Sequence, residues 1–228
     1  MRAILFGATG MVGSGVLKEC LDDPRVEKVL VLGRGTCGVH HEKLEEILHG
    51  DFFDYSGIEE RLRGYDAGFF CLGVSAAGMS EEKYHRLTYD LTMAAAETLA
   101  RLNPDMTFCY VSGAGTDSTE KGRSMWARVK GKTENALLRL PFEAAYMFRP
   151  GYIQPMKGVR SKTRLYQTVY NVVGPFYPLL KRVFPNSLTT SRTLGRAMIQ
   201  VVLEKPEAKI LAPKDINGLA GEEVSRAG

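Results

Sequence analysis

The sequence contains little cysteine and no long apolar run. Its 228 residues include four cysteines, with no close pair and no metal-ligand spacing: Cys20, Cys37, Cys71 and Cys109. This pattern argues against a disulfide scaffold or a zinc module, and it favours buried thiols in a reducing compartment. No apolar stretch reaches the length of about 18 residues that a membrane span needs, and the stretch beginning at Ala3 lacks the basic flank of a signal peptide. We therefore expect a cytoplasmic protein.

Histidine is as scarce as cysteine. His40, His41 and His49 lie near one another in the sequence, and His85 lies apart. No cysteine or pair of acidic residues accompanies them at the spacing of metal ligands, so we expect a polar loop and no metal site.

A long segment of the chain lacks acidic residues. Residues 121–196 contain 15 lysines and arginines but only two acidic residues, Glu134 and Glu143, which gives the segment a net charge of +13. The whole chain has a net charge of only +4, so the remaining residues contribute −9. We expect the basic segment to face an anion.

Short apolar runs alternate with longer amphipathic ones, in a composition that is 44% hydrophobic and 25% charged, as in globular proteins. The apolar runs predict strands at Ala3–Phe6, Lys28–Leu32, Leu44–Leu48, Gly68–Leu72, Thr107–Ser112 and Ala144–Phe148. Helices are predicted at about 11–22, 56–63, 80–102 and 124–140. Because near-continuous apolar strands suit a sheet that is covered on both faces, we predict an α/β fold with a Rossmann-type doubly wound parallel sheet.

The helix predicted over 80–102 begins with Ser80 as its expected N-cap. Apolar side chains then recur at three- and four-residue steps, which indicates one buried stripe: Tyr84, Leu87, Leu91, Ala95, Leu99 and Leu102.

The pattern changes after Pro150, where four prolines interrupt the next segment: Pro155, Pro175, Pro178 and Pro185. A helix over about 191–204 and a strand at Lys209–Ala212, stopped by Pro213, follow. We predict a single domain over residues 1–228: a Rossmann core at 1–150, a small C-terminal cap at 151–190, and a returning helix and strand at 191–228.

A glycine-rich turn joins the first predicted strand to the first predicted helix. In Gly7-Ala-Thr-Gly-Met-Val-Gly13, every third residue is a glycine. Glycine lets backbone N–H groups approach a pyrophosphate at a helix N-terminus, and the last glycine lets the helix pack against the strand. We therefore predict NAD(P) binding, with contacts from Gly7, Thr9, Gly10, Met11, Val12 and Gly13.

An arginine follows the second predicted strand, where an acidic residue would bind the ribose of NAD. The guanidinium of Arg34 instead suits a 2′-phosphate, so we predict NADP rather than NAD. An exposed loop arginine without a ligand is the alternative.

The glycine spacing and several later motifs resemble the extended and atypical short-chain dehydrogenase/reductase superfamily. Cys71-Leu72-Gly73-Val74-Ser75, Val129-Lys130-Gly131 and Phe148-Arg149-Pro150-Gly151 are similar to Tat-interacting-protein-like oxidoreductases, whose bacterial relatives are often called nucleoside-diphosphate-sugar epimerases. The resemblance implies that Asp51, followed by Phe52, meets the adenine, although Asp51 could equally begin a helix. It also implies that Leu72 and Gly73 let the backbone approach the cofactor's ribose.

The same resemblance implies a catalytic serine after the fifth strand and a Tyr-x-x-x-Lys pair on the next helix. Ser112 occupies the serine position, and Lys130 occupies the lysine position, where it would orient the nicotinamide ribose and lower the pKa of the tyrosine. The tyrosine position holds Trp126, whose indole N–H does not titrate in water. Tyr152 and Tyr89 are candidate substitutes, and a core position is the alternative for each.

We therefore expect an NADP(H)-binding oxidoreductase or epimerase-like enzyme that acts on a small or anionic substrate. Trp126 leaves open a regulatory or scaffold protein that binds the cofactor without turning it over.

The basic and aromatic residues of 157–184 allow a substrate-binding cap, a peripheral contact with an anionic membrane, or a solvated basic face. No nucleic-acid module is recognisable, so we expect no nucleic-acid partner. The sequence leaves the substrate and the oligomeric state open.

Overall fold

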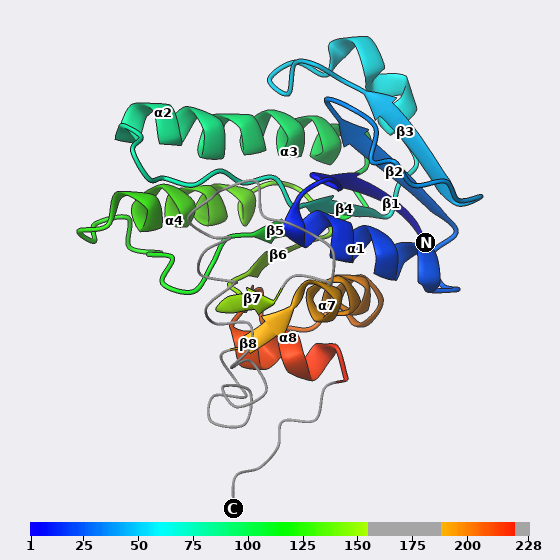
Figure 1. Ribbon diagram of the computed structural model, residues 1–228. Coiled ribbons are helices and arrows are strands. Elements are labelled where there is room, and N and C mark those ends of the chain that lie inside the picture. Colours follow the sequence, from blue (N-terminus) through cyan, green and yellow to red (C-terminus); the bar gives the residue numbers. More distant parts are fainter. Residues whose placement is uncertain (155–187, 222–228) are drawn as a thin grey trace, which may run out of the picture.

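The computed structural model describes residues 1–154 and 188–221, and a seven-stranded parallel sheet lies at its centre (Figure 1). The strands are β1 Arg2–Phe6, β2 Lys28–Gly33, β3 Leu44–Leu48, β4 Ala67–Phe70, β5 Thr107–Val111, β6 Ala144–Phe148 and β9 Ile210–Leu211. Their order is β3-β2-β1-β4-β5-β6-β9, and all neighbours are parallel. The direction of winding reverses between β1 and β4, which confirms the predicted Rossmann-type doubly wound sheet.

Successive side chains of the central strand point to opposite faces of the sheet. In β1, Ala3 and Leu5 pack into one hydrophobic cluster, while Ile4 and Phe6 pack into a second cluster on the other face. All four side chains are buried. The apolar run of β1 is therefore explained by helices on both sides of the sheet.

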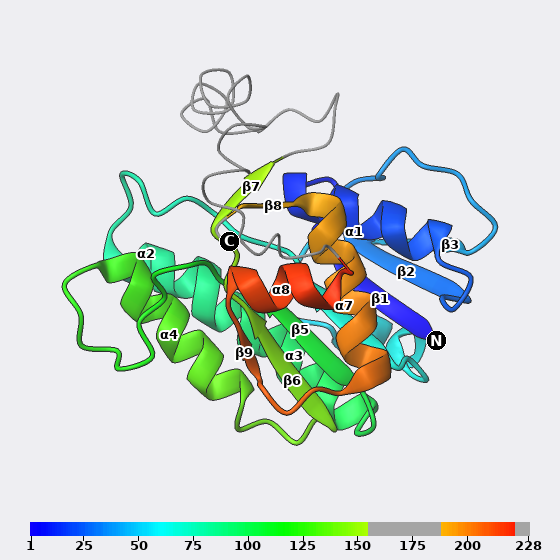
Figure 2. The ribbon, with the colours of Figure 1, turned by 90° about the horizontal axis from the view of Figure 1, so that it is seen from below.

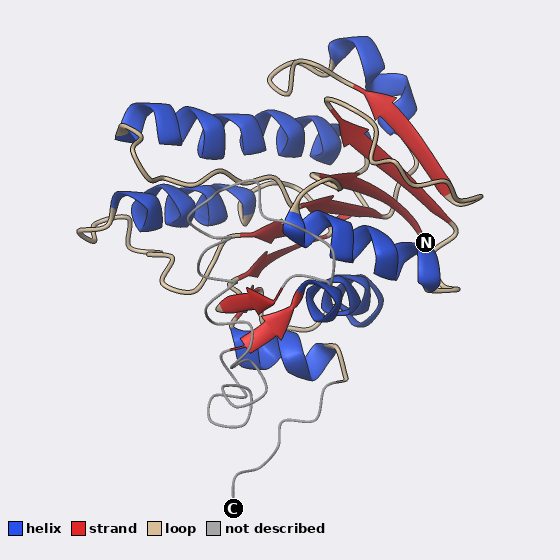
Figure 3. Ribbon diagram, in the orientation of Figure 1, coloured by secondary structure: helices blue, strands red, loops and turns tan. Residues whose placement is uncertain are grey.

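Helices cover both faces of the sheet (Figures 1 and 3). One face is covered by α1 (Met11–Asp22), α7 (Ser191–Glu204) and α8 (Pro213–Leu219). The other is covered by the 3₁₀ helix η1 (Ser56–Leu62), α3 (Leu91–Leu102) and α4 (Met125–Leu137). Among the residues that the structure describes, no helix is both long enough and apolar enough to cross a membrane.

The helix predicted over 80–102 is interrupted. Ser80 caps α2 (Glu81–His85) by accepting a hydrogen bond from the backbone of Lys83 (3.3 Å), as expected. A π-helical turn, η2 (Arg86–Asp90), then precedes α3. A π turn breaks the three- and four-residue period. Leu87 and Leu91, predicted to be core residues, are consequently only half-buried.

The end of the chain also differs from the prediction. Pro213, expected only to stop a strand, is the first residue of α8. Proline suits this position because the first N–H groups of a helix have no hydrogen-bond partner within the helix.

Two strands that were not predicted, β7 (Tyr152–Gln154) and β8 (Leu188–Thr190), form a separate parallel pair. Figure 2 shows this pair, and β9 beside β6 at the sheet edge. Residues 155–187, most of the predicted cap and all of its basic aromatic segment, lie outside the described residues.

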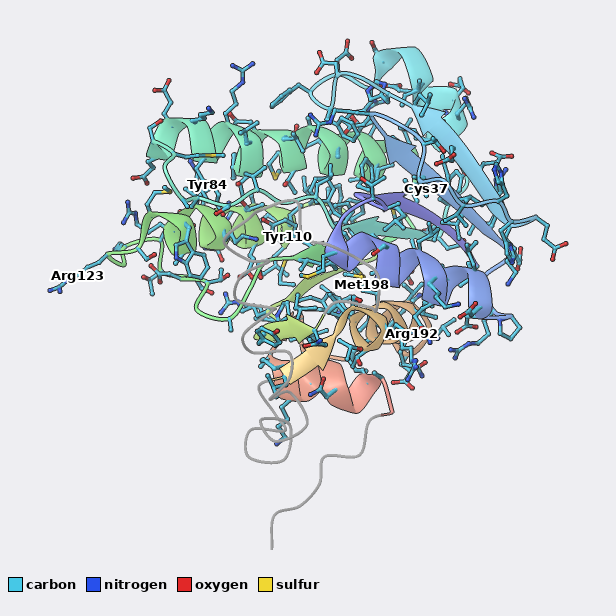
Figure 4. All side chains as sticks on the ribbon, viewed as in Figure 1. Cys37, Tyr84, Tyr110, Arg123, Arg192 and Met198 are labelled. Carbon is cyan, nitrogen blue, oxygen red and sulfur yellow. The ribbon has the colours of Figure 1, made fainter. Side chains whose placement is uncertain are left out.

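Helices α1 and α7 pack unusually closely because glycines face each other's backbone. A Cβ atom on Gly15 would lie 2.5 Å from Cβ of Ser191, and one on Gly195 would lie 3.0 Å from Cα of Val16. Beside this contact, the buried carboxylate of Glu19 accepts hydrogen bonds from Arg192 and Arg196 of α7. Figure 4 labels Arg192 on α7, next to α1. Helix α1, which follows the glycine turn, is thus held in place by residues of α7.

This packing predicts a position-dependent effect of adding one methyl group. Gly15→Ala should destabilise the fold by about 1–3 kcal/mol, because the two helices must move apart. Gly218→Ala is the matched control in α8, where a Cβ would meet no atom within 4 Å, and it should raise stability by up to about 1 kcal/mol. Urea denaturation of both variants checks this, and equal stability of the two would contradict the packing described.

Candidate functional site

Three adjoining cavities run along the carboxyl ends of the parallel strands. The first has a volume of about 510 Å³ and is lined by Gly7, Thr9, Arg34, Phe52, Leu87 and Leu91, among others. The second, of about 450 Å³, lies beside Gly10, Met11, Val12 and Tyr152, and the third, of about 490 Å³, beside Trp126 and Tyr84. Leu72 and Gly73 line both the first and the second cavity, and Ser112 and Lys130 line both the second and the third. The cavities therefore form one groove.

The glycine turn beneath this groove needs its glycines for two different reasons. Gly7 has a φ of +83°, and a Cβ there would lie 2.9 Å from the backbone of Cys71. A Cβ on Gly13 would lie 2.1 Å from the carbonyl oxygen of Gly7, so this glycine lets α1 close against the turn. Gly13 is accordingly buried below the groove instead of lining it. Gly10 is the N-cap of α1 and supplies no side-chain cap, so N–H groups of the first turn face the second cavity.

The first cavity brings together some of the residues predicted to bind adenosine but not all of them. Arg34 lies exposed at the end of β2 and lines the cavity, and among the described residues its guanidinium has no carboxylate partner. Phe52 is buried and packs edge-on against Phe6, with ring centroids 6.4 Å apart. Asp51 does not line the cavity: its carboxylate accepts a hydrogen bond from the backbone of Phe53 (2.9 Å), as a turn residue does.

Lys130 extends from α4 to the ends of the central strands. Its Nζ donates to the carbonyl oxygen of Ser112 (2.7 Å) and to that of Val111 (3.3 Å). It also lies 5.6 Å from the centre of the Tyr110 ring. Burial lowers the pKa of Lys130 to about 8, although the nearby Glu134 opposes this shift. Lys130 is the titratable amine at the junction of the second and third cavities.

Ser112, at the end of β5, belongs to a buried network of charged groups. Its Oγ lies 2.5 Å from a carboxylate oxygen of Glu134 and 3.1 Å from the carbonyl oxygen of Phe148. Glu134 is fully buried and forms an ion pair with Arg149, whose guanidinium contacts both carboxylate oxygens. Arg149 also donates to Ser118 Oγ (2.5 Å). Helix α4 is thereby tied to the ends of β5 and β6.

The aromatic candidates for proton donation lie at different places. Trp126 is one helical turn before Lys130 and lines the third cavity, with its ring against Gly115. Tyr152 lines the second cavity, and its hydroxyl is 3.4 Å from Gln154 Oε1. Tyr89 lies outside the lining of all three cavities, where it stacks on His85 (centroids 4.7 Å apart) and lies beneath Lys132. Of the two tyrosines considered as substitutes, the groove contains Tyr152 only.

The structure adds residues that the sequence analysis did not assign to the site. Leu87 and Leu91 were interpreted as core residues, but they line the first cavity because the π turn rotates them toward it. Glu134 was assigned no role in the site, yet two signals mark it: it is one of two acidic residues in the basic segment, and it follows Lys130 by four positions. Within residues 1–154 and 188–221, no three His, Cys, Asp or Glu side chains gather as a metal site.

The groove suits a dinucleotide in shape and in the groups that it offers. It is long and runs across β1, where the winding of the sheet reverses. Uncapped N–H groups at the start of α1 lie midway along it, and no acidic residue occupies the first turn to repel a phosphate. Gly7, Thr9, Arg34 and Leu72 would hold the adenosine side, and Gly10, Gly73, Ser112 and Lys130 the nicotinamide side.

Solved structures of similar fold include an enzyme in complex with NAD⁺ and an epimerase. The Bordetella bronchiseptica enzyme WbmF in complex with NAD⁺ aligns with a TM-score of 0.65 and 13% identity, over 97% of this chain and 79% of that one. A UDP-galactose 4-epimerase aligns with a TM-score of 0.62 and 18% identity, over 93% of this chain and 76% of that one. At such identities the similarity establishes the fold.

Sequence relatives include the protein HTATIP2 of Rattus norvegicus, which is 28% identical over 152 residues. That match covers 65% of this chain and 61% of the rat protein. The mitochondrial protein FMP52 of Meyerozyma guilliermondii is 24% identical over 230 residues, which cover 97% of this chain and 96% of that protein. The expected cytoplasmic localisation is contradicted by the FMP52 relatives, which are named as mitochondrial proteins.

The family model that matches residues 3–123 covers the glycine turn, the first five strands and Ser112. It describes the NAD dependent epimerase/dehydratase family. These residues make up more than half of the chain, and they include every element that forms the first cavity. The chain is a Rossmann-fold, NAD(P)-binding member of the NAD dependent epimerase/dehydratase family.

Proposed function

We propose that this protein is an NADP(H)-dependent oxidoreductase or epimerase-like enzyme that acts on a small or anionic substrate. The observation that supports the proposal most directly is the position of Lys130 and Ser112, which line both the cavity beside the glycine turn and the cavity beyond it. A substrate in the third cavity would meet the same two residues that border the nicotinamide side of the groove. When bound, the cofactor supplies or accepts a hydride.

The residues of the groove have separable tasks in this proposal. The N–H groups at the start of α1 bind the pyrophosphate, and Phe52, Leu87 and Leu91 shield the adenosine side from water. Lys130 and Ser112 orient the reacting end by hydrogen bonds. Two positive charges of the described residues, Arg34 in the first cavity and Lys130 where the second and third cavities meet, favour an anionic ligand in the groove.

The preference for NADP over NAD rests on Arg34. Its guanidinium, which has no carboxylate partner among residues 1–154 and 188–221, lies at the end of β2, where the ribose of the adenosine half is bound in Rossmann proteins. A phosphate can receive two parallel hydrogen bonds from a guanidinium. In the part of the chain that the structure describes, no Asp or Glu lines this cavity to bind a ribose 2′-hydroxyl.

Trp126 supports a second candidate function. An indole occupies the place of the expected phenol and cannot exchange a proton near neutral pH. A protein that binds NADPH and signals its presence, without turnover, is compatible with every contact in the first two cavities.

Removing the guanidinium should change cofactor preference. Arg34→Ala is expected to weaken NADPH binding by about 10- to 100-fold, because a charged hydrogen-bonding pair is lost, and to leave NADH binding nearly unchanged. Fluorescence titration with both nucleotides measures this. Arg63→Ala, which removes an exposed arginine outside the cavity lining, is the control. Equal losses for NADPH and NADH would contradict the assignment of Arg34.

Turnover separates the two candidate functions. The wild-type protein is expected to oxidise NADPH in the presence of at least one member of a panel of carboxylate- and phosphate-bearing aldehydes and ketones. Gly73→Val should abolish binding and turnover without lowering the melting temperature, since a Cβ there points into open space in the groove. Gly57→Val, at an exposed glycine of η1 with similarly open surroundings, is the matched control. Tight NADPH binding with no turnover across the panel would favour the regulatory protein.

A further inference from the structure

We propose that Lys130 Nζ itself donates the proton to the substrate oxygen, and that Glu134 and Arg149 are positioning residues that hold the Ser112 hydroxyl out of that role. This inference rests on the proposed function, because it assigns the proton donor of the reaction proposed there. Three observations support it: the location of Nζ, the direction of the Ser112 hydroxyl, and the absence of a titratable group at Trp126.

Lys130 has a hydrogen atom to give. An ammonium group has three N–H bonds, and two of them are directed at the carbonyl oxygens of Ser112 (2.7 Å) and Val111 (3.3 Å). The side chain lines both the second and the third cavity. The remaining N–H bond can therefore reach a substrate oxygen where the two cavities meet.

Ser112 has no hydrogen atom to give. A hydroxyl has one proton, and the Glu134 carboxylate at 2.5 Å is a closer and stronger acceptor than the Phe148 carbonyl oxygen at 3.1 Å. Glu134 is fully buried and held on both oxygens by Arg149, so it cannot turn away. Ser112 Oγ consequently offers lone pairs to the cavity and accepts a hydrogen bond from the product hydroxyl.

Titratable and charged groups from several elements surround Lys130. Glu134 lies on α4 itself, Tyr110 on β5 and Tyr84 on α2, with Arg149 of the β6 end beyond Glu134. Figure 4 labels Tyr84 and Tyr110. Tyr152 and Cys71 line the same cavity. Burial lowers the pKa of Lys130 to about 8 in spite of Glu134, whereas burial raises the pKa values of Tyr110 and Cys71. An acid with a pKa near 8 can release its proton at physiological pH.

The proton balance of the step is simple. The Nζ–H bond of Lys130 breaks and an O–H bond forms on the substrate oxygen, while the hydride that completes the reduction comes from the reduced nicotinamide named in the proposed function. Lys130 is left as a neutral amine and regains a proton from solvent. Reduction needs the ammonium form, so its rate should be highest below the pKa of Lys130 and fall as the pH rises through about 8.

The test compares variants that separate the positive charge of residue 130 from its ability to transfer a proton. Lys130→Arg keeps the positive charge but cannot release a proton near neutral pH. It should retain NADPH binding by fluorescence titration and lose about 10²- to 10⁴-fold in kcat. Tyr152→Phe removes the alternative donor from the second cavity and should lower kcat far less than Lys130→Arg, with the wild-type pH profile kept. Tyr89→Phe, outside all three cavities, is the control that should leave kcat unchanged. In Glu134→Gln, loss of the negative charge should move the pH profile to lower pH.

A second measurement does not depend on turnover. NMR of the protein after reductive ¹³C-methylation reports the pKa of each lysine, and Lys130→Met identifies the Lys130 signal by its disappearance. A titration near pH 8 supports the inference, and a titration near 10.5 overturns it. Activity retained in Lys130→Arg but lost in Tyr152→Phe also overturns it and makes Tyr152 the donor. Absence of wild-type turnover on every substrate rejects the proposed function and the proton transfer together.

Discussion

One buried carboxylate, that of Glu134, constrains the whole reacting end of the groove. Leaving such a charge without a partner costs about 3–5 kcal/mol, so Arg149 and Ser112 must stay in contact with it. Arg149 directly follows β6 and Ser112 directly follows β5. The Glu134 carboxylate therefore holds the ends of these two strands against α4. Lys130 lies one turn earlier on the same helix and is bound to the same strand end. The position of the amine is thereby set by the ion pair.

The basic segment, interpreted from the sequence as facing an anion, has in part another use: four of its nine described lysines and arginines form ion pairs within the protein. Arg149 pairs with Glu134, Arg128 of α4 pairs with Glu81, and Arg192 and Arg196 of α7 pair with Glu19. Most of these acidic partners come from the acidic remainder of the chain, which explains how +13 and −9 coexist in one fold. Arg123 extends outward from the α4 end of the molecule instead (Figure 4). Of the charged side chains that the structure describes, Arg34 and Lys130 line the groove.

The sequence predicted the features that depend on local pattern. The strand at Ala144–Phe148 and the helices at 11–22 and 191–204 begin and end as expected, because apolar runs and caps act over a few residues. The π turn at Arg86–Asp90 was missed, since its residues keep an apolar spacing that also fits an uninterrupted helix. The pairing of β7 with β8 and the contact of Glu134 with Arg149 join residues that only the sheet topology brings together. The helix that begins at Pro213 was also missed, although it could have been predicted. The preference of proline for the first turn of a helix is a local signal that can be read from the sequence.

We propose that the groove is one continuous site, with the adenosine half at Arg34 and the reacting half at Lys130. A crystal structure of the protein with NADPH tests this most directly. We expect the 2′-phosphate at the guanidinium of Arg34, the pyrophosphate on the first N–H groups of α1, and the nicotinamide beside Ser112 and Lys130. A cofactor whose nicotinamide lies away from Lys130, or whose pyrophosphate does not contact α1, would contradict it.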